Sequence, residues 1–213
     1  MTARAATWVK ICGITCPEDA VHAIEAGADA LGLNFVPSSR RRIEPETARE
    51  IARAASGRAE LVGVVADLDA QAAERLRCEL GLDWLQLHGA EPPALVAGLP
   101  RAFKAYGVGS ASDAAAAAAY GVERLLVDAR VAGELGGTGV SFDWTLVVEL
   151  ARARPLILAG GLRPDNVADA IRAVRPFGVD TASGVERDGD ARRKDPDKLV
   201  AFVRAARGAQ REP

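Results

Sequence analysis

The sequence has few of the residues that define specialised classes of protein. Its three cysteines, Cys12, Cys16 and Cys78, cannot all pair with one another and fit no zinc-binding spacing, so a disulfide-built scaffold is excluded. No apolar stretch approaches the ~20 residues that cross a bilayer, and the first residues lack the apolar core and cleavage site of a signal peptide. We therefore expect a cytoplasmic protein with reduced thiols and no membrane partner.

An excess of charge of one sign is also absent. The chain has 27 basic and 29 acidic residues, a formal net charge of -2, and this balance gives no electrostatic reason to expect nucleic acid as a partner. With 49% hydrophobic and 26% charged residues, the composition is typical of a globular protein that buries a sizeable core. Neither nucleic acid nor an anionic membrane is therefore expected as the main partner.

What the sequence does have is a strict alternation of short apolar runs with Ala-rich amphipathic stretches. Several of the amphipathic stretches begin with proline and acidic residues, the usual start of a helix. The strand-like runs are 9–14, 29–35, 60–67, 84–89, 101–108, 124–129, 155–161 and 178–185. The helix-like stretches are 17–27, 45–55, 69–80, 92–98, 112–120, 142–151, 164–174 and 195–206.

This alternation predicts the fold class. Strands that are apolar on both sides and separated by helices indicate a parallel sheet covered on both faces. Eight such units predict a closed (β/α)8 barrel, and an open doubly wound sheet, which usually has fewer strands, is the alternative. We find no Pro/Gly/Ser-rich linker, so we expect one barrel domain over residues 1–213, as a monomer or a homodimer. Against the ~250 residues typical of the fold, this length leaves little for inserted domains, so the loops after the strands must recognise the substrate.

Reactive or small residues end five of the predicted strands. Because the chemistry of a barrel lies at the carboxyl ends of its strands, residues there are candidates for function. They are Lys10 to Gly13, Gln86 to Gly89, Asp128, Gly160 with Gly161, and Ser183 with Gly184.

Three glycine clusters favour a phosphate site. Gly160 and Gly161 precede a Pro-Asp-Asn helix start, Ser183 and Gly184 form a small-residue turn, and Gly137 belongs to a third cluster after strand six. Barrels often hold phosphate between the loops after strands seven and eight, on backbone N–H groups and a helix N-terminus. Glycine allows the backbone to approach the anion closely. Any one cluster is equally well explained as a turn, but the three together favour phosphate.

Cys12 and Asp128 are candidates for acid–base chemistry. A lone buried cysteine is usually a small hydrophobic residue. Strand alternation, however, puts Lys10 on the same face as Cys12, which favours a depressed thiol pKa and a reactive thiolate. Asp128 ends an otherwise apolar strand and either caps the next turn or acts as a general acid with a raised pKa. Cys16 and Cys78 lie in or near helices and are interpreted as structural.

Two further features are open to more than one interpretation. Arg40, Arg41 and Arg42 form either a solvated charge run or a clamp for a carboxylate, to which at most one of them contributes. His88 is a core imidazole, a substrate contact or an orienting group.

The chain also carries a series of motifs in order: KICGIT (10–15), GLNF-P-S-RR (32–42), LQLHG (85–89), the Asp of LLVDA (125–129), GGTG-SFDW (136–144), AGGLRPDNV (159–167) and VDTASGVE (179–186). This set resembles that of phosphoribosylanthranilate isomerases, and the resemblance covers essentially the whole chain. It implies a (β/α)8 barrel that acts on N-(5-phosphoribosyl)anthranilate, a phosphosugar of tryptophan biosynthesis, with no metal or organic cofactor.

The resemblance also implies roles for individual residues. Cys12 matches the family's general base and Asp128 its general acid, while Arg41 matches the contact to the anthranilate carboxylate. The implied reaction is an Amadori rearrangement, in which a proton is delivered to the ribose ring oxygen and another is removed from C2′. The resemblance places the phosphate on the loops at Gly160–Gly161 and Ser183–Gly184.

Two other functions remain as alternatives. The first is another phosphosugar barrel, such as an epimerase, a histidine-pathway isomerase or an indole-forming synthase. Only His22 and His88 are present, too few for the ligands of a metal-dependent epimerase. The second is a non-catalytic phosphosugar-binding protein, which would need neither the Cys12 base nor the Asp128 acid.

Overall fold

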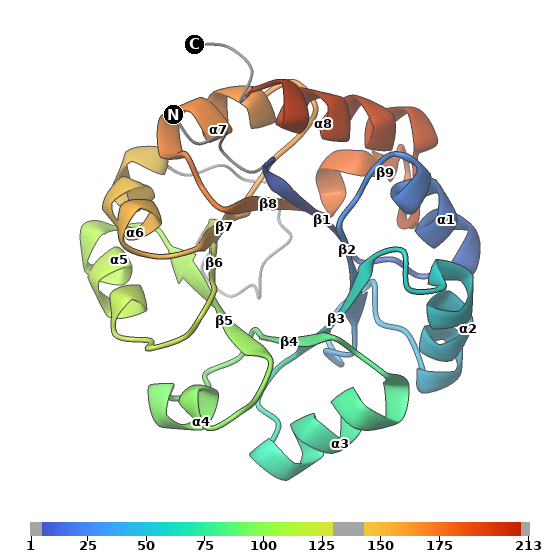
Figure 1. Ribbon diagram of the computed structural model, residues 1–213, viewed down its shortest axis with the longest axis horizontal. Helices are drawn as coiled ribbons and strands as arrows, with labels where there is room; N and C mark the ends of the chain where they lie inside the picture. Colours follow the sequence, from blue (N-terminus) through green and yellow to red (C-terminus); the bar gives the residue numbers. More distant parts are fainter. Residues whose placement is uncertain (1–5, 130–142, 210–213) are drawn as a thin grey trace.

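Eight parallel strands close into a barrel in the order β1 to β8 (Figure 1). The computed structural model describes residues 6–129 and 143–209. Strand β8 pairs with β1, with Lys10 beside Asp180, and this pairing completes the ring. The predicted (β/α)8 barrel is thus confirmed and the open sheet is wrong. The strands are β1 (Trp8–Cys12), β2 (Ala30–Asn34), β3 (Glu60–Val65), β4 (Trp84–Leu87), β5 (Ala102–Val108), β6 (Leu125–Ala129), β7 (Leu156–Leu158) and β8 (Gly178–Thr181).

Helices surround the barrel as an outer ring (Figure 1). Proline occupies the first turn of α1, α2, α4 and α8, where its missing N–H costs no hydrogen bond. Gly81, with φ 62°, ends α3 in the left-handed conformation. The helices are α1 (Pro17–Glu25), α2 (Pro45–Ala55), α3 (Ala70–Leu80), α4 (Pro93–Ala97), α5 (Ala111–Ala118), α6 (Val148–Ala153), α7 (Val167–Val174) and α8 (Pro196–Gly208). No helix in the part of the chain described is long and apolar enough to span a membrane.

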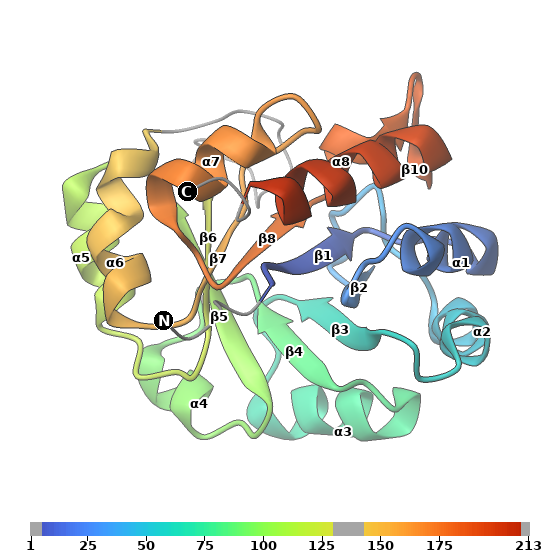
Figure 2. The same ribbon diagram turned by 45° about the horizontal axis from the view of Figure 1, so that its top comes forward.

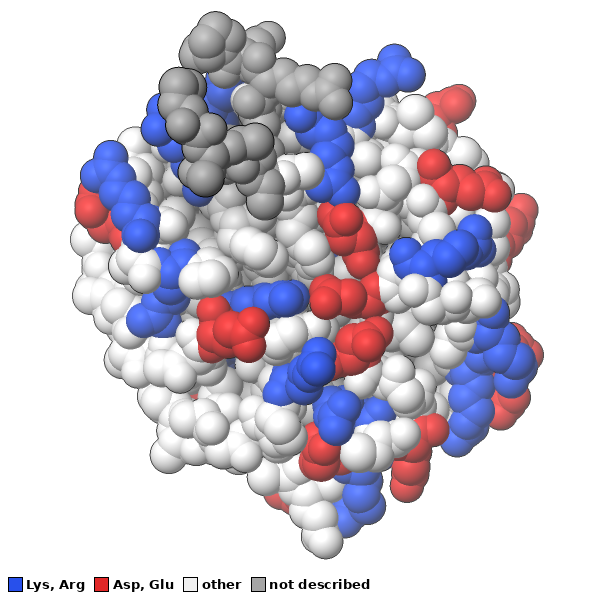
Figure 3. Space-filling view, in the orientation of Figure 1, with Lys and Arg blue, Asp and Glu red and all other residues white. Residues whose placement is uncertain are grey.

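The interior of the barrel is filled at the amino-terminal end of its strands. Glu60 accepts hydrogen bonds from the indole N–H groups of Trp8 at 3.1 Å and Trp84 at 3.2 Å. The guanidinium of Arg124 lies 4.1 Å from the ring centroid of Trp84. On the face shown in Figure 3, basic and acidic side chains are interleaved rather than sorted into large fields of one sign. Because the amino-terminal end of the barrel is packed with side chains, a substrate must enter at the carboxyl-terminal end of the strands.

The largest difference from the predicted elements follows β8. The strand expected over 178–185 ends at Thr181, and a short 3-10 turn, η2 (Ser183–Val185), follows it. The chain then forms an antiparallel hairpin of β9 (Glu186–Arg187) and β10 (Asp190–Lys194), which lies beside α8 in both ribbon views (Figure 2).

Two other predicted elements are shorter than expected. One helix is expected over 142–151, but the described residues from 143 onward form a 3-10 turn, η1 (Trp144–Val147), followed by the short helix α6. Helix α7 begins at Val167 rather than at residue 164. The loop before it is held by Asn166, whose side chain accepts a hydrogen bond from the N–H of Arg163 and donates one to the carbonyl of Gly161.

Candidate active site

The two residues expected to perform acid–base chemistry lie at the same end of the barrel. Cys12 is the last residue of β1, and Asp128 is the next-to-last residue of β6. Both are buried, with exposed fractions of 9% and 8%. Because β7 and β8 stand between β6 and β1, these residues are on strands that are not neighbours in the ring.

Lys10 and Cys12 face the same side of β1, as strand alternation predicts. A side chain at Gly32 of β2 would meet both the sulfur of Cys12 and Cε of Lys10. The ammonium of Lys10, which has no exposed surface, forms an ion pair with Asp180 at 2.7 Å. Although burial lowers the pKa of Lys10, the charges of Asp180 and Cys12 raise it above its ordinary value overall.

The prediction of a depressed thiol pKa is wrong. Burial raises the pKa of the Cys12 thiol above its ordinary value, and Lys10 and Lys194 only partly oppose this effect. The carboxylate of Asp180 adds to the increase. The neighbouring ammonium therefore does not decide the outcome, because it is already paired with a carboxylate and the sulfur is desolvated. The raised pKa favours the thiol over the thiolate in the ligand-free protein at neutral pH.

A second buried ammonium, that of Lys194 in β10, reaches the same region. Its Nζ donates a hydrogen bond to the carbonyl of Ala182 at 2.9 Å and lies 3.5 Å from Glu186. Burial lowers the pKa of Lys194 to about 8, while the Glu186 and Cys12 charges raise it and the Arg41 charge lowers it further. The ammonium therefore belongs to the electrostatic surroundings of Cys12.

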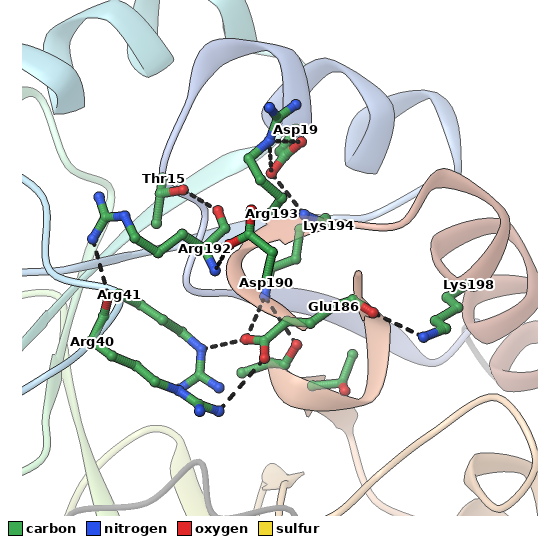
Figure 4. A network of polar contacts seen from close by, with 12 residues as sticks. Thr15, Asp19, Arg40, Arg41, Glu186, Asp190, Arg192, Arg193, Lys194 and Lys198 are labelled. Atoms are coloured by element: carbon green, nitrogen blue, oxygen red, sulfur yellow. Dashed lines mark hydrogen bonds and ion pairs between the residues drawn. The ribbon is translucent and has the colours of Figure 1, made fainter. Parts of the chain in front are cut away.

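Of the three consecutive arginines, only Arg41 is buried. The side chains of Arg40 and Arg42 are 59% and 46% exposed, whereas Arg41 as a whole is 7% exposed. Its Nε lies 2.5 Å from Glu186, and both are drawn in Figure 4. Gly13, with φ 72°, gives room for the arginine stem, since a side chain there would collide with it. The Nη2 atom of Arg41 is buried and has no hydrogen-bond partner among the residues described.

His88 is a neutral imidazole that is partly exposed at the end of β4. Burial, followed by the charges of Lys104 and Lys10, lowers its pKa to about 4. Its Nδ1 lies 3.1 Å from the side-chain nitrogen of Gln86; with the amide in this orientation, Nδ1 accepts and the proton is on Nε2 of the imidazole. His88 therefore presents a neutral polar ring, consistent with either a substrate contact or an orienting role.

A buried ion pair supports the loop that carries His88. Lys104 of β5 lies 2.9 Å from Glu91 and donates a hydrogen bond to the carbonyl of Gly89 at 2.5 Å. Glu91 also accepts from the backbone N–H of Asp67, at the end of β3. One pair therefore connects the loops after β3 and β4.

The two glycine loops expected to bind phosphate are held together. Gly160 and Gly161 have φ values of 90° and 62°, which suit glycine. The hydroxyl of Thr181 donates to the carbonyl of Leu162 at 2.8 Å and so joins the end of β8 to the loop after β7. A side chain at Gly184 would collide with the same carbonyl. Ser183 and Gly184 form η2, and Gly137 lies outside the described residues.

The other two cysteines lie in or beside helices rather than on a barrel strand. Cys78 is an exposed residue of α3, and Cys16 immediately precedes α1. Among the residues described, Cys16, Glu18 and Asp19 are close enough to share a cation. The Asp19 carboxylate, however, already accepts from the N–H of Lys194 and pairs with Arg193, so we assign no metal to this group.

Sequence reasoning missed the contributions of Glu186 and Lys194 to the site, because it missed the hairpin. The signal was present: Asp188-Gly189 is a favoured pair for a two-residue hairpin turn, and Gly189 has φ 78°. No element is predicted from the sequence for the charged residues on either side, 186–194.

Comparisons with known proteins agree with this geometry. A family model described as N-(5'phosphoribosyl)anthranilate (PRA) isomerase matches residues 9–205. An N-(5'-phosphoribosyl)anthranilate isomerase of Desulforudis audaxviator is 48% identical over 206 residues, covering 95% of this chain and 99% of that protein.

Solved structures give the same result. One shows monomers generated from the dimeric enzyme of Thermotoga maritima, with 38% identity, a TM-score of 0.84 and coverage of 95% and 99% of the two chains. Another is a phosphoribosyl anthranilate isomerase in complex with reduced 1-(o-carboxyphenylamino)-1-deoxyribulose 5-phosphate, with 37% identity, a TM-score of 0.85 and the same coverage. The chain belongs to the N-(5'-phosphoribosyl)anthranilate isomerase family.

Proposed function

We propose that the chain performs the isomerase reaction of its family with Cys12 as the general base and Asp128 as the general acid. The chain is an isomerase of tryptophan biosynthesis, which converts N-(5'-phosphoribosyl)anthranilate to 1-(2-carboxyphenylamino)-1-deoxyribulose 5-phosphate. The observation that carries the role assignment is the placement of one thiol and one carboxyl group, both buried, at one end of the barrel on non-adjacent strands.

The reaction needs two proton transfers. Protonated Asp128 gives its proton to the ribose ring oxygen, and the C1′–O bond breaks to leave an open-chain Schiff base. Cys12, as the thiolate, then takes the proton from C2′, and the electron pair moves to form an enolamine. The enolamine tautomerises to the ketone. These steps are internal to the substrate, so the proposal includes no metal or organic cofactor.

The raised pKa of Cys12 places a condition on this mechanism. Because the resting residue is a thiol, the thiolate must form as part of the catalytic cycle, at a cost in free energy. The ammonium groups of Lys10 and Lys194 are the charges that favour the thiolate. We assign them this role in the proposed mechanism.

Arg41 is the proposed ligand of the anthranilate carboxylate. Glu186 is shared by three cations, since it pairs with Arg40 and Lys194 as well as with Arg41. The site therefore has excess positive charge beside the unpartnered Nη2 of Arg41. A planar guanidinium suits a carboxylate because it can donate two parallel hydrogen bonds. His88 is proposed as a second, neutral substrate contact.

The phosphate is proposed to bind between the loops after β7 and β8. Gly160, Gly161, Ser183 and Gly184 supply backbone N–H groups without bulky side chains, and the hydroxyl of Thr181 fixes the spacing of the two loops. Gly137 remains a proposed contributor from the loop after β6.

The broader setting is part of the same proposal. We propose one domain and a cytoplasmic location, with which three free cysteines are compatible. A homodimer is one candidate assembly, since the Thermotoga maritima relative is dimeric, and a monomer is the other.

The test is to follow the fluorescence of the anthranilate group while the purified chain is mixed with N-(5'-phosphoribosyl)anthranilate. Turnover with formation of the deoxyribulose product supports the proposal. Binding without any change in the substrate at micromolar protein would instead support a phosphosugar-binding protein. Turnover only of a different phosphosugar would support another barrel enzyme.

A further inference from the structure

We propose that the β9–β10 hairpin positions Arg41 for the substrate carboxylate, through Arg192 and Glu186. This inference rests on the proposed function, in which Arg41 is the carboxylate ligand. It assigns a role to the β9–β10 hairpin as a whole. The hairpin follows the last barrel strand, and the proposed mechanism gives it no other role as a whole.

The first contact fixes the backbone around Arg41. Nη1 of Arg192, in β10, donates hydrogen bonds to the carbonyls of Arg40 and Arg42, each at 3.0 Å. One guanidinium therefore holds the carbonyls of both residues that flank Arg41. Because Arg192 is exposed, this contact restrains the loop without being part of a buried core.

The second contact fixes the side chain of Arg41. Glu186, in β9, accepts a hydrogen bond from Nε, the atom of the guanidinium that lies nearest the stem. With Nε held and the backbone held, the planar group has a defined orientation. Nη2, the buried nitrogen without a partner among the described residues, is then left to donate to a ligand.

The hairpin is itself attached to the barrel and to α1. The hydroxyl of Thr15, in the loop after β1, donates to the carbonyl of Arg192. The N–H of Lys194 donates to Asp19 at 2.8 Å, and Arg193 pairs with Glu18 at 2.5 Å. Figure 4 shows the contacts of Thr15 and Asp19 with the hairpin, together with those between the hairpin and the arginine loop. The hairpin is therefore a fixed support rather than a free flap.

This arrangement explains why an exposed arginine would matter for binding. When a ligand must first order an arginine side chain, the lost conformational entropy of that side chain reduces the binding free energy. A guanidinium that is already oriented avoids this cost, and its Nη2 atom is available to donate to the ligand. Loss of the Arg192 contact should therefore weaken substrate binding while leaving the proton-transfer groups in place.

The test compares Arg192→Ala and Glu186→Gln with Arg41→Ala. By the usual free energy of a hydrogen bond to a charged group, Arg192→Ala should raise KM by about tenfold with little change in kcat. Glu186→Gln keeps an acceptor for Nε but lacks the charge, so its KM should lie between those of the wild type and Arg41→Ala. The control is Arg49→Ala, which removes an exposed arginine from the neighbouring helix α2 and should change neither constant.

Two further measurements distinguish a loss of Arg41 orientation from a general disruption of the binding site. Competitive inhibition by inorganic phosphate should be unchanged in Arg192→Ala, because the guanidinium of Arg192 donates to the carbonyls of Arg40 and Arg42, whereas the proposed phosphate ligands are backbone N–H groups of the glycine loops. The double variant Arg41→Ala/Arg192→Ala should bind substrate no more weakly than Arg41→Ala alone, because Arg192 acts through Arg41.

The outcomes distinguish the positioning role of the hairpin from the carboxylate-binding role of Arg41 on which it rests. If Arg41→Ala raises KM but Arg192→Ala and Glu186→Gln do not, the positioning role is wrong and the proposed function stands. If Arg41→Ala itself leaves KM unchanged, the carboxylate site of the proposed function is wrong. Equal weakening of phosphate inhibition and of substrate binding in Arg192→Ala would also overturn the positioning role.

Discussion

The ammonium of Lys10 is paired with the carboxylate of Asp180 at 2.7 Å inside the barrel, on the same side of β1 as the sulfur of Cys12. The pair joins the first strand to the last and closes the ring at a polar contact. Burial, the largest effect, raises the pKa of the Cys12 thiol; the charge of Lys10 lowers this pKa, and the charge of its partner Asp180 raises it.

This pair makes Asp180 important for stability. Asp180→Asn should lower the free energy of unfolding by about 3–5 kcal/mol, because it leaves a buried ammonium without its carboxylate. Urea unfolding measures the change. Glu149→Gln, which breaks an exposed ion pair with Arg152, is the matched control and should have a small effect.

A double replacement checks the cause. Lys10→Met/Asp180→Leu removes both charges and should be more stable than Asp180→Asn alone. Equal stability of Asp180→Asn and the wild type would show that the pair contributes nothing.

The resting state of Cys12 can be tested by alkylation. Because Cys12 is buried and has a raised pKa, whereas Cys78 is exposed, iodoacetamide should modify Cys78 first and Cys12 last at neutral pH. Mass spectrometry of the separated peptides gives the order. Modification of Cys12 before Cys78 would mean that the resting residue is a thiolate after all.

The barrel itself was predictable from local patterns. Strands buried on both faces and helices that begin with proline are encoded within a few residues, as in α2, where Pro45 occupies the first turn. The positions of Cys12 and Asp128 at one end of the barrel follow directly from the same reasoning, since parallel strands present their carboxyl ends together.

The electrostatics of the site were not predictable in this way. The pKa of Cys12 depends on burial and on Asp180 and Lys194, which follow it by more than 160 residues in the sequence. Lys10 is only two residues from Cys12 in the sequence, so reasoning from neighbouring residues overestimated its effect on the pKa of Cys12. The choice among the three arginines likewise depends on Glu186, which only the fold brings to Arg41.

His88 should make stability depend on pH. The pKa of His88 is about 4 in the folded chain, whereas the ordinary value is 6.5. Between pH 4 and pH 6.5, the unfolded chain therefore binds a proton at His88 that the folded chain does not. The free energy of unfolding therefore falls as the pH drops through this range. His88→Gln should lose less stability than the wild type on acidification, as measured by urea unfolding. Parallel loss in both proteins would contradict the assignment of a neutral imidazole with a lowered pKa.

Gly184 should be needed for the phosphate loops to meet. Gly184→Ala places a methyl group against the carbonyl of Leu162, so the loops after β7 and β8 must separate and KM should rise. Gly208→Ala at the end of α8 has open space around it and is the matched control, with KM unchanged. Steady-state kinetics of both variants make the comparison. An unchanged KM in Gly184→Ala would mean that the spacing of these loops does not matter for binding.

The most direct test of the central claim is kcat for purified Cys12→Ala and Asp128→Asn, followed by anthranilate fluorescence. Loss of a general base or acid should lower kcat by ~10²–10⁴-fold in each variant, with little change in KM. A kcat close to that of the wild type in either variant would contradict the role assigned to that residue.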